Sequence, residues 1–187
     1  TSPQGMTFNS DGTRMFVTGP TSDSVAQYDL TTAFDVSTAS FSGNSFSIGS
    51  EESTATGIRF NNSGTRMFVV GESSDSVHQY HLSTGFDITT ASFSGNSFDV
   101  SSEDGEPRDV AFNITGTRMF IVGIINNKVY QYDLPTPFDL ELQGPFYTGL
   151  SFDVSSEAVN PTDVKFNNTG SRMFVIGNQS DSVHQYN

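Results

Sequence analysis

The sequence predicts an all-β protein, a β-propeller of four-stranded antiparallel blades, and three observations support this fold class. All 17 phenylalanines fall on positions that recur along the chain; in one series, Phe16, Phe68, Phe120 and Phe174 lie 52, 52 and 54 residues apart. A repeat of about this length is typical of solenoids and propellers. Each copy also holds four strand-like segments separated by turn residues, and no segment shows a sustained helical period.

The second repeat is the clearest copy, and its first strand is expected over residues 56–60. Ile58 and Phe60 share one face while Arg59 lies on the other, which is the alternation of a strand packed on one side. Residues 61–64, Asn-Asn-Ser-Gly, predict a hairpin because glycine supplies the positive φ that tight turns need. Residues 65–71 follow as an almost continuous apolar strand, which predicts cover on both faces and a central place in the sheet.

A third strand is expected over residues 76–82. A polar connection, a loop at residues 94–96 and a short last strand over 97–100 complete the unit. The other copies repeat these segments, so the chain is expected to hold 15 strands in blades of four, four, four and three. It is predicted to be one propeller domain, 1–187, with blades at about 1–54, 55–106, 107–160 and an incomplete 161–187.

The first hairpin and the third strand resemble the YVTN-type propeller repeat. The resemblance rests on residues 8–17, Phe-Asn-Ser-Asp-Gly-Thr-Arg-Met-Phe-Val, and residues 23–30, Asp-Ser-Val-Ala-Gln-Tyr-Asp-Leu, and it extends to all four copies. Blades of that family are shorter, and the excess length here lies in the last connection and strand. The resemblance implies a propeller but no definite activity, because such repeats serve many roles.

The incomplete fourth blade leaves the closure of the ring open. A closed four-bladed ring is one possibility, but an arc of a larger propeller, or two chains that close an eight-bladed ring, is favoured. The chain begins at Thr1 and stops early in its fourth copy, which predicts a processed product or part of a longer chain. An arc exposes the packing face of an end blade, so a protein partner or self-association is expected at the incomplete fourth blade.

Composition and charge exclude several classes of partner. The net charge is −13, from 21 acidic and 8 basic residues, so no basic surface is available to bind nucleic acid or an anionic membrane. No apolar run reaches the roughly 20 residues needed to span a bilayer. The chain has no cysteine, which excludes disulfides and thiol chemistry. Few lysines and many Asp, Ser, Thr and Asn residues predict an extracellular protein, or one on a cell or particle surface.

Two regular series are candidate ligand contacts that repeat from blade to blade. The arginines are expected to form a ring of anion contacts or, as the favoured alternative, to pair with local acids such as Asp11 and Asp23 or with hairpin carbonyls. The tyrosines are candidates for glycan contacts, although packing with a satisfied hydroxyl is favoured. These residues are Arg14, Arg66, Arg118 and Arg172, and Tyr28, Tyr80, Tyr132 and Tyr186.

No cofactor or metal is predicted, and Ca²⁺ is the one alternative. Carboxylate clusters suit Ca²⁺, but the EF-hand spacing is missing and Asx residues at strand starts normally cap turns. His78 and His184 are equivalent to Ala26 and Tyr130, and His81 lies on the opposite face from His78, so chelation is not expected. The calcium candidates are Asp23, Asp75, Asn127 and Asp181, with Asp35, Asp87 and Asp139.

The chain carries four sequons, which are candidate N-glycosylation sites. They begin at Asn61, Asn113, Asn167 and Asn178, and the first three lie in hairpin turns, where they are expected to be exposed.

No catalytic residue is predicted from the sequence. Neither a nucleophile elbow, nor a phosphate loop, nor a His-Glu metal motif occurs. No acid stands out as unique to one copy in an apolar setting, as a tuned general acid should. The expected function is therefore a non-catalytic structural or recognition scaffold. A multivalent carbohydrate-binding lectin is the first alternative, and a propeller hydrolase or lactonase-like enzyme is the second.

Overall fold

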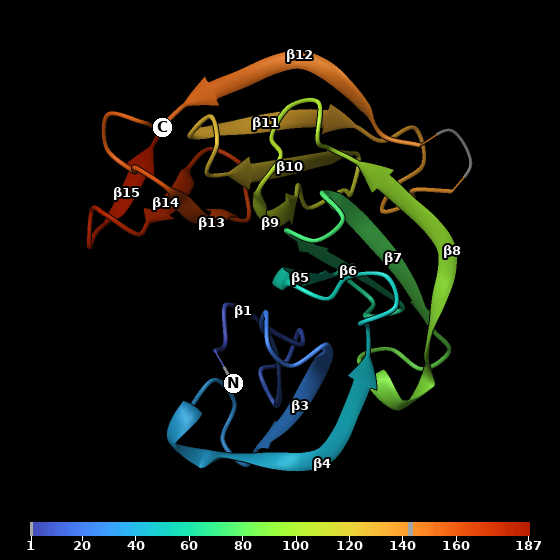
Figure 1. Ribbon diagram of the computed structural model, residues 1–187. Coiled ribbons are helices and arrows are strands. Elements are labelled where there is room, and N and C mark those ends of the chain that lie inside the picture. The colour runs from blue at the N-terminus through green and yellow to red at the C-terminus, as the bar shows by residue number, and fades with distance from the viewer. Residues whose placement is uncertain (1, 142–143) are drawn as a thin grey trace.

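The computed structural model describes residues 2–141 and 144–187, and it consists of four antiparallel sheets that follow one another as propeller blades (Figure 1). Strand order in each sheet follows chain order, so every blade is a meander. Blade 1 comprises β1 (Gly5–Phe8), β2 (Arg14–Thr18), β3 (Ser24–Leu30) and β4 (Ala39–Ser47). Blade 2 comprises β5 (Ala55–Phe60), β6 (Arg66–Gly71), β7 (Ser76–Leu82) and β8 (Ala91–Asp99). Blade 3 comprises β9 (Pro107–Phe112), β10 (Arg118–Gly123), β11 (Lys128–Asp133) and β12 (Phe146–Asp153), and blade 4 comprises β13 (Pro161–Phe166), β14 (Met173–Gly177) and β15 (Val183–Tyr186).

The predicted all-β class and the blades of four, four, four and three strands are confirmed. The helical segments of the described residues are two short 3₁₀ turns, η1 (Val36–Thr38) and η2 (Ile88–Thr90). Within this described part of the chain, no helix is long and apolar enough to cross a membrane.

Each blade begins with a hairpin whose turn depends on an asparagine and a glycine. In blade 2 the Oδ1 atom of Asn61 accepts a hydrogen bond from the backbone N–H of Arg66 at 3.0 Å, and Gly64 adopts a φ of 71°. A Cβ atom at Gly64 would lie 2.3 Å from the ring of Phe86, so both the backbone angle and the close ring require glycine. Phe86 and its equivalents Phe34 and Phe138 each cover the hairpin of their own blade in this way.

The outer strand of the complete blades differs from the sequence prediction of a loop followed by a short strand. In blade 2 it is continuous over β8, and a bulge takes the place of the loop. Tyr80 pairs with Phe93 and His78 pairs with Ser97, so residues 94–96 face only one residue of β7. The bulge contains a glycine at a φ of 89°, and the strand bends strongly there (Figure 1). The turn-forming residues of this segment predicted a break in the strand. The backbone pairs with β7 on both sides of residues 94–96, so the segment stays within the sheet as a bulge.

The blades pack through apolar faces that repeat along the chain. One apolar cluster lies at each boundary between consecutive blades. At the boundary between blades 2 and 3, Phe68 is fully buried and its ring centroid lies 4.6 Å from that of Phe112. Burial of one such side chain contributes roughly 1.5–3 kcal/mol. The second strand is therefore covered on both faces, as its continuous apolar character predicted.

The four blades form an arc with two uncovered end faces. The inner strands contact one another in sequence, β1 with β5, β5 with β9 and β9 with β13. Among the described residues no comparable set of contacts joins β13 to β1, and Figure 1 shows the two end blades apart. Ile176 and Val183 on blade 4 are 41% and 63% exposed, whereas their blade 2 equivalents Val70 and Val77 are fully buried. The missing neighbour, rather than a change of residue type, leaves these side chains in solvent.

Candidate active site at the propeller axis

The inner strands of blades 2, 3 and 4 bring four charged side chains together at the axis. Arg59 lies on β5 and Asp109 on β9, while Asp163 and Lys165 both lie on β13. The Nη2 atom of Arg59 is 2.5 Å from Oδ2 of Asp109 and 3.2 Å from Oδ1 of Asp163. The Nζ atom of Lys165 is 3.0 Å from that Asp163 oxygen and 3.6 Å from Oδ2 of Asp109. Two carboxyl groups and two cations thus form one network, here called the axis cluster.

Asp109 is the buried member of the axis cluster, with a side chain only 4% exposed. Burial raises the pKa of its carboxyl well above the usual range; the Arg59 guanidinium opposes this rise and the negative charge of Asp163 adds to it. Its Oδ2 atom also accepts a hydrogen bond from the backbone N–H of Val164 at 3.2 Å. Gly57 makes room for the carboxyl, because a Cβ atom there would lie 2.8 Å from Oδ1 of Asp109. A buried carboxyl with a shifted pKa beside a specific cation is typical of a functional site.

Arg59 connects the axis cluster to every blade. Its Nη1 atom donates to the Ile58 carbonyl of its own strand at 2.6 Å and to the Met6 carbonyl of blade 1 at 3.5 Å. Its Nη2 atom contacts Asp109 of blade 3 and Asp163 of blade 4. One arginine therefore bonds to all four sheets.

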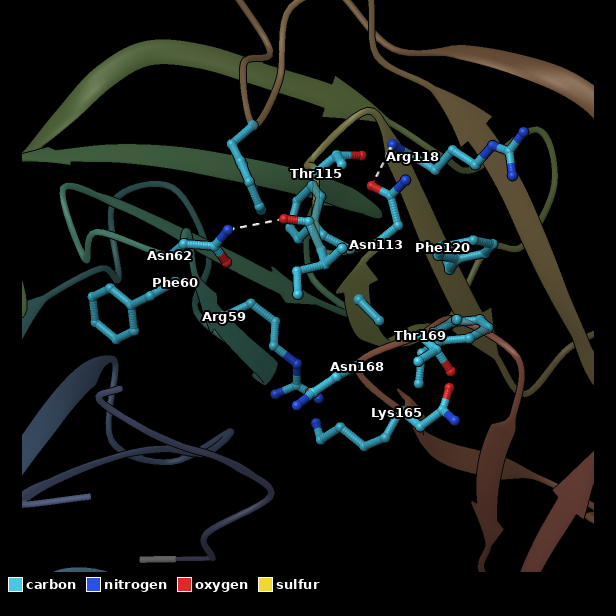
Figure 2. Close-up of a pocket in the computed structure, with 17 residues that line it drawn as sticks. Arg59, Phe60, Asn62, Asn113, Thr115, Arg118, Phe120, Lys165, Asn168 and Thr169 are labelled. Carbon is cyan, nitrogen blue, oxygen red and sulfur yellow. Dashed lines mark hydrogen bonds between the residues drawn. The ribbon is translucent and has the colours of Figure 1, made fainter. Parts of the chain in front are cut away.

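A cleft of about 490 Å³ opens beside the axis cluster, between the first hairpins of blades 2, 3 and 4 (Figure 2). Its volume lies in the range of small-molecule sites. Of its 17 lining residues three are basic and none is acidic. Figure 2 shows Arg59 and Lys165 directed toward each other at one end of this cleft. The third basic residue is Arg118.

The walls of the cleft combine amides and hydroxyls with aromatic rings. Asn62 donates from Nδ2 to the Ile114 carbonyl at 2.9 Å across the boundary between blades 2 and 3. Such a mixture of hydrogen-bonding groups and apolar surface suits a small polar ligand. The other polar lining residues are Asn113, Thr115, Asn167, Asn168 and Thr169, and the aromatic ones are Phe60, Phe112, Phe120, Phe138 and Phe166.

The first two arginines of the repeated series bridge neighbouring blades. Arg14 donates from Nη1 to the Phe86 carbonyl of blade 2 at 2.9 Å, and Arg66 pairs with Asp139 of blade 3 at 2.9 Å. The favoured expectation of a local partner is therefore wrong for Arg66, whereas Arg14 also has a local acid, with its Nε atom 3.9 Å from Oδ1 of Asp29. Asp11 instead accepts a hydrogen bond from the backbone N–H of Thr13 at 2.9 Å, because it caps the turn.

Arg118 contacts a local acid, and the backbone of Arg172 closes its own hairpin as in the other copies. The Nε atom of Arg118 lies 3.6 Å from Oδ1 of Asp133 on the neighbouring strand. The backbone N–H of Arg172 donates to Oδ1 of Asn167 at 3.1 Å. Asp23, the other local acid expected to pair with an arginine, occupies a turn at a φ of 45°. The four arginines do not converge on one site, and Arg118 is the member that lines the cleft.

The repeated tyrosines pack between blades. Tyr80 and Tyr132 are fully buried, while Tyr28 and Tyr186 at the two ends are partly exposed. Three of them donate the hydroxyl to a glutamate from the segment that precedes their blade: Tyr80, Tyr132 and Tyr186. Burial raises the pKa of Tyr186 to about 12, and the adjacent Glu157 charge adds to the rise. The pairs are Tyr80–Glu51 at 3.3 Å, Tyr132–Glu103 at 3.1 Å and Tyr186–Glu157 at 3.3 Å.

Three of the four sequon asparagines are engaged in the fold rather than freely exposed. Asn61, Asn113 and Asn167 are half-buried, and each Oδ1 atom accepts a backbone hydrogen bond within its hairpin. Their Nδ2 atoms donate to Thr or Ser hydroxyls at 3.2, 3.0 and 3.1 Å. Full exposure was expected because the turns are short and polar, but the amide itself closes each turn. Asn178 is exposed.

The calcium candidates serve the backbone. Asp23, Asp75, Asn127 and Asp181 adopt φ values between 45° and 51°, a left-handed conformation that Asx side chains tolerate. Asp35 and Asp87 accept hydrogen bonds at the starts of η1 and η2, and Asp139 pairs with Arg66. Over residues 2–141 and 144–187, no three His, Asp or Glu side chains gather in a way that could hold a metal ion.

A second polar cluster lies away from the cleft, beside the turn between β6 and β7. The Ser74 hydroxyl oxygen is 2.7 Å from Nε2 of His78 and donates to Oε2 of Glu52 at 2.7 Å. Glu52 also accepts hydrogen bonds from the backbone N–H groups of Thr54 and Ser73 at 2.8 and 3.1 Å. In a catalytic triad the carboxylate orients the histidine, whereas here it bonds the serine and caps a loop. The arrangement is therefore structural.

The axis cluster was not predicted from the sequence, because Arg59 was expected only on the open face of a strand packed on one side. No acid was expected to be unique to one copy in an apolar setting, and Asp109 is not unique, because Asp163 occupies the equivalent position; the burial of Asp109 is seen only in the structure. The sequence did carry a signal, since charged residues replace small or neutral ones at two equivalent positions. Arg59 and Lys165 stand where the other copies have Thr7 and Ala111, and Asp109 and Asp163 stand where they have Gly5 and Gly57.

No protein-family model matches the chain, and no curated protein matches its sequence. Solved structures do resemble it. They include a candidate 6-phosphogluconolactonase from Bacteroides uniformis ATCC 8492, with a TM-score of 0.66 and 13% identity over 98% of this chain and 50% of that one. The periplasmic gluconolactonase PpgL of Pseudomonas aeruginosa has a TM-score of 0.63 and 13% identity, over 98% and 49%. The propeller domain of Myceliophteria thermophila Cps50 (Swd1) has a TM-score of 0.60 and 13% identity, over 98% and 52%.

These similarities establish the propeller fold, and the chain spans about half the length of these three structures. They also contradict the expectation of a non-catalytic scaffold, because two of these three neighbours carry the names of lactonases. The expectation of a non-catalytic scaffold rested on the regularity of the repeat. At the axis cluster the copies carry different residues, so the repeat is not regular there. The lactonase-like enzyme, the second alternative from the sequence, agrees better with these neighbours.

Proposed function

We propose that this chain is a lactonase-like hydrolase that binds an anionic, polyhydroxylated substrate in the cleft beside the axis cluster. The observation that carries the proposal is the charge of the cleft. The chain has 21 acidic residues and only 8 basic ones, yet three of the basic residues and none of the acidic ones line the cleft. The carboxyl groups that pair with Arg59 and Lys165 lie outside this lining, so the wall of the cleft presents the cationic groups, which favour an anion.

The axis cluster supplies the groups that hydrolysis needs. Asp163 has a side chain 40% exposed, so water can reach it, whereas Asp109 is buried. Burial raises the pKa of Asp109 and removes its carboxyl from water, so the two carboxyl groups of the axis cluster have different environments. Asp163 does not line the cleft itself, but its Oδ1 atom lies 3.2 Å from Arg59 and 3.0 Å from Lys165, which do. Asp163 is therefore the proposed general base at the edge of the cleft, and Asp109 holds the Arg59 side chain in position.

The proposed step opens a lactone ring. Asp163 takes a proton from a water molecule as the water oxygen attacks the lactone carbonyl carbon. Arg59 and Lys165 stabilise the negative charge that develops on the carbonyl oxygen. The ring C–O bond then breaks, the proton passes from Asp163 to the leaving oxygen, and the product is a hydroxy acid.

The names of the neighbours support the substrate class. Gluconolactone and its 6-phosphate, the substrates these names indicate, are polyhydroxylated, and the phosphate adds the negative charge that the cleft favours. The periplasmic neighbour and the acidic composition support a secreted or periplasmic location. We also assign the blades to a long-blade variant of the YVTN-type repeat, on the motif of residues 8–17.

The test is hydrolysis of 6-phosphogluconolactone above its spontaneous rate, compared with that of gluconolactone. Asp163→Asn is expected to lower kcat by about 100-fold or more, since general acid–base catalysis contributes 10²–10⁴-fold. Lys165→Met is expected to raise KM for the phosphorylated substrate more than for the neutral one. Lys128→Met is the matched control, because Lys128 is the other lysine of the chain and lies outside the cleft.

Two results would contradict the proposal. One is a wild-type protein that does not accelerate hydrolysis of either lactone. The other is a rate that Asp163→Asn leaves unchanged while both proteins remain folded by circular dichroism.

A further inference from the structure

We propose that the axis cluster takes up a proton when an anion binds in the adjoining cleft, so that anions bind more tightly as the pH falls. This inference deepens the proposed function and rests on it for the place where the anion binds. It concerns binding alone, however, so its test does not require hydrolysis. Its basis is the way in which the two carboxyl groups of the axis cluster share their cations.

The carboxyl groups of Asp109 and Asp163, here called the carboxyl pair, contact the same two cationic nitrogen atoms. Oδ2 of Asp109 and Oδ1 of Asp163 lie 2.5 and 3.2 Å from Nη2 of Arg59. The same two oxygens lie 3.6 and 3.0 Å from Nζ of Lys165. Two carboxyl groups that share a site in this way influence each other's ionisation, so they gain and lose protons as a pair.

The charged groups around the carboxyl pair determine the charge of the whole cluster. β5 contributes Arg59 and β13 contributes Lys165, whereas β1 has no charged residue. Arg108, the basic residue of β9, pairs instead with Glu72 and Glu106. With both carboxyl groups ionised the axis cluster is neutral, and with one proton bound it carries a single positive charge. An anion in the cleft therefore favours the form that holds the proton.

Lys165 is the more exposed of the two cations and the one that an anion can engage. Its side chain is 47% exposed, whereas that of Arg59 is 12% exposed and also donates to the carbonyls of Ile58 and Met6. When the Lys165 ammonium group turns toward an anion in the cleft, Asp163 is left with less compensating charge. A proton can replace that charge, because it neutralises one member of the carboxyl pair.

The burial of Asp109 determines the direction of this effect. Burial raises the pKa of its carboxyl well above the usual range; the Arg59 guanidinium opposes the rise, and the adjacent Asp163 carboxyl adds to it. The carboxyl pair therefore binds a proton at a higher pH than an exposed aspartate does. Binding of the anion and binding of the proton promote each other to the same extent. Uptake of one proton raises the affinity for the anion by up to about tenfold for each unit by which the pH falls.

The experiment measures binding of gluconate by isothermal titration calorimetry between about pH 5 and pH 8, where the carboxyl group of gluconate stays ionised. Gluconate is the hydroxy acid that gluconolactone yields, so it is an anion with the hydroxyl groups of the proposed substrate. The wild type is expected to bind it more tightly as the pH falls, by up to about tenfold per unit. Titrations in two buffers with different heats of ionisation give the number of protons taken up. Sorbitol, which has a similar chain of hydroxyl groups and no charge, is expected to show no such dependence.

Asp163→Asn and Asp109→Asn each leave the cluster with one carboxyl group and two cations. Each variant is expected to bind gluconate at about pH 8 as tightly as the wild type does at about pH 5, without taking up a proton. Asp163 is 40% exposed, so its variant keeps the test decisive if the buried Asp109→Asn variant does not fold.

Asp29→Asn is the matched control, because it changes the net charge by the same amount. Asp29 is 54% exposed, pairs with Arg14 in blade 1 and lies outside the lining of the cleft. This variant is expected to keep the pH dependence of the wild type.

Gluconate that binds with the same affinity over the whole pH range would overturn the proposal, and so would a protein that does not bind gluconate at any pH. Proton uptake that persists in both axis variants would overturn it as well, because the proton would then bind elsewhere. The proposed hydrolysis is judged separately, from the rate of lactone opening, so the failure of one proposal does not decide the other.

Discussion

The boundaries between blades are nearly the same in every repeat, whereas the axis differs from blade to blade. The phenylalanine pairs at the three boundaries have centroid separations of 4.4–4.7 Å. At the axis, one equivalent position holds Thr7, Arg59, Ala111 and Lys165 in turn. The residues that repeat in every blade therefore stabilise the fold, and the residues that differ between blades form the candidate site.

The two regions also differ in the interactions that hold them. The boundaries are apolar, and burial of their surface stabilises the fold directly. The axis cluster buries a carboxyl group and most of an arginine, an arrangement whose desolvation cost offsets much of its electrostatic gain. A cluster of this kind adds little net stability, which agrees with the role in binding and catalysis that we propose for it.

The largest expected loss of stability follows from removing a buried ring at the boundary between two blades. Phe68→Ala should lower the free energy of unfolding by about 4 kcal/mol, because it removes a fully buried ring and leaves a cavity. Urea denaturation measures this change. Phe41→Ala is the control, since Phe41 is 56% exposed, and it should cost far less. Equal losses in the two variants would remove the distinction between boundary and surface phenylalanines.

The next largest loss of stability is expected when the axis cluster loses its buried arginine. Arg59→Met leaves Asp109 buried without its cation, which should cost about 3 kcal/mol near neutral pH. Because burial raises the pKa of Asp109, its carboxyl gains a proton in the folded state as the pH falls, and the cost should then decline. Denaturation over a pH series measures both quantities.

The control for that series is Arg118→Met, whose side chain is 55% exposed and whose partner Asp133 is 42% exposed. Its effect should be small and nearly independent of pH. If the loss of stability in Arg59→Met stayed constant down to acid pH, the buried charge could not be that of Asp109.

The smallest effect separates an internal boundary from an end face. Tyr132→Phe removes a buried hydroxyl that bonds Glu103, and it should cost about 1 kcal/mol. Tyr186→Phe removes the equivalent bond to Glu157 on the partly exposed end blade and should cost less. Denaturation of the two variants under the same conditions makes the comparison direct. A greater loss in Tyr186→Phe would show that the end blade is as well buried as the interior.

Much of the fold could be predicted from local sequence. The hairpins follow from Asn and Gly at fixed offsets, as in Asn61 and Gly64, and the central strand follows from its apolar run. The outer strand could be predicted only in part, because the bulge at Gly95 looks like a loop until its pairing with β7 is known. The partners of Arg14 and Arg66 could not be predicted, since they belong to the next blade.

The sequence by itself determined the repeat, its strands and the residues that pack between blades, because each blade contacts mainly its neighbours in the chain. Only the tertiary structure decided the axis cluster. Arg59 meets Asp109 from 50 residues away and Asp163 from 104 residues away, and the curvature of the arc brings their inner strands together. The repeat places these residues on equivalent strands but does not show which of them meet. They depend on how the packed sheets turn about a common axis.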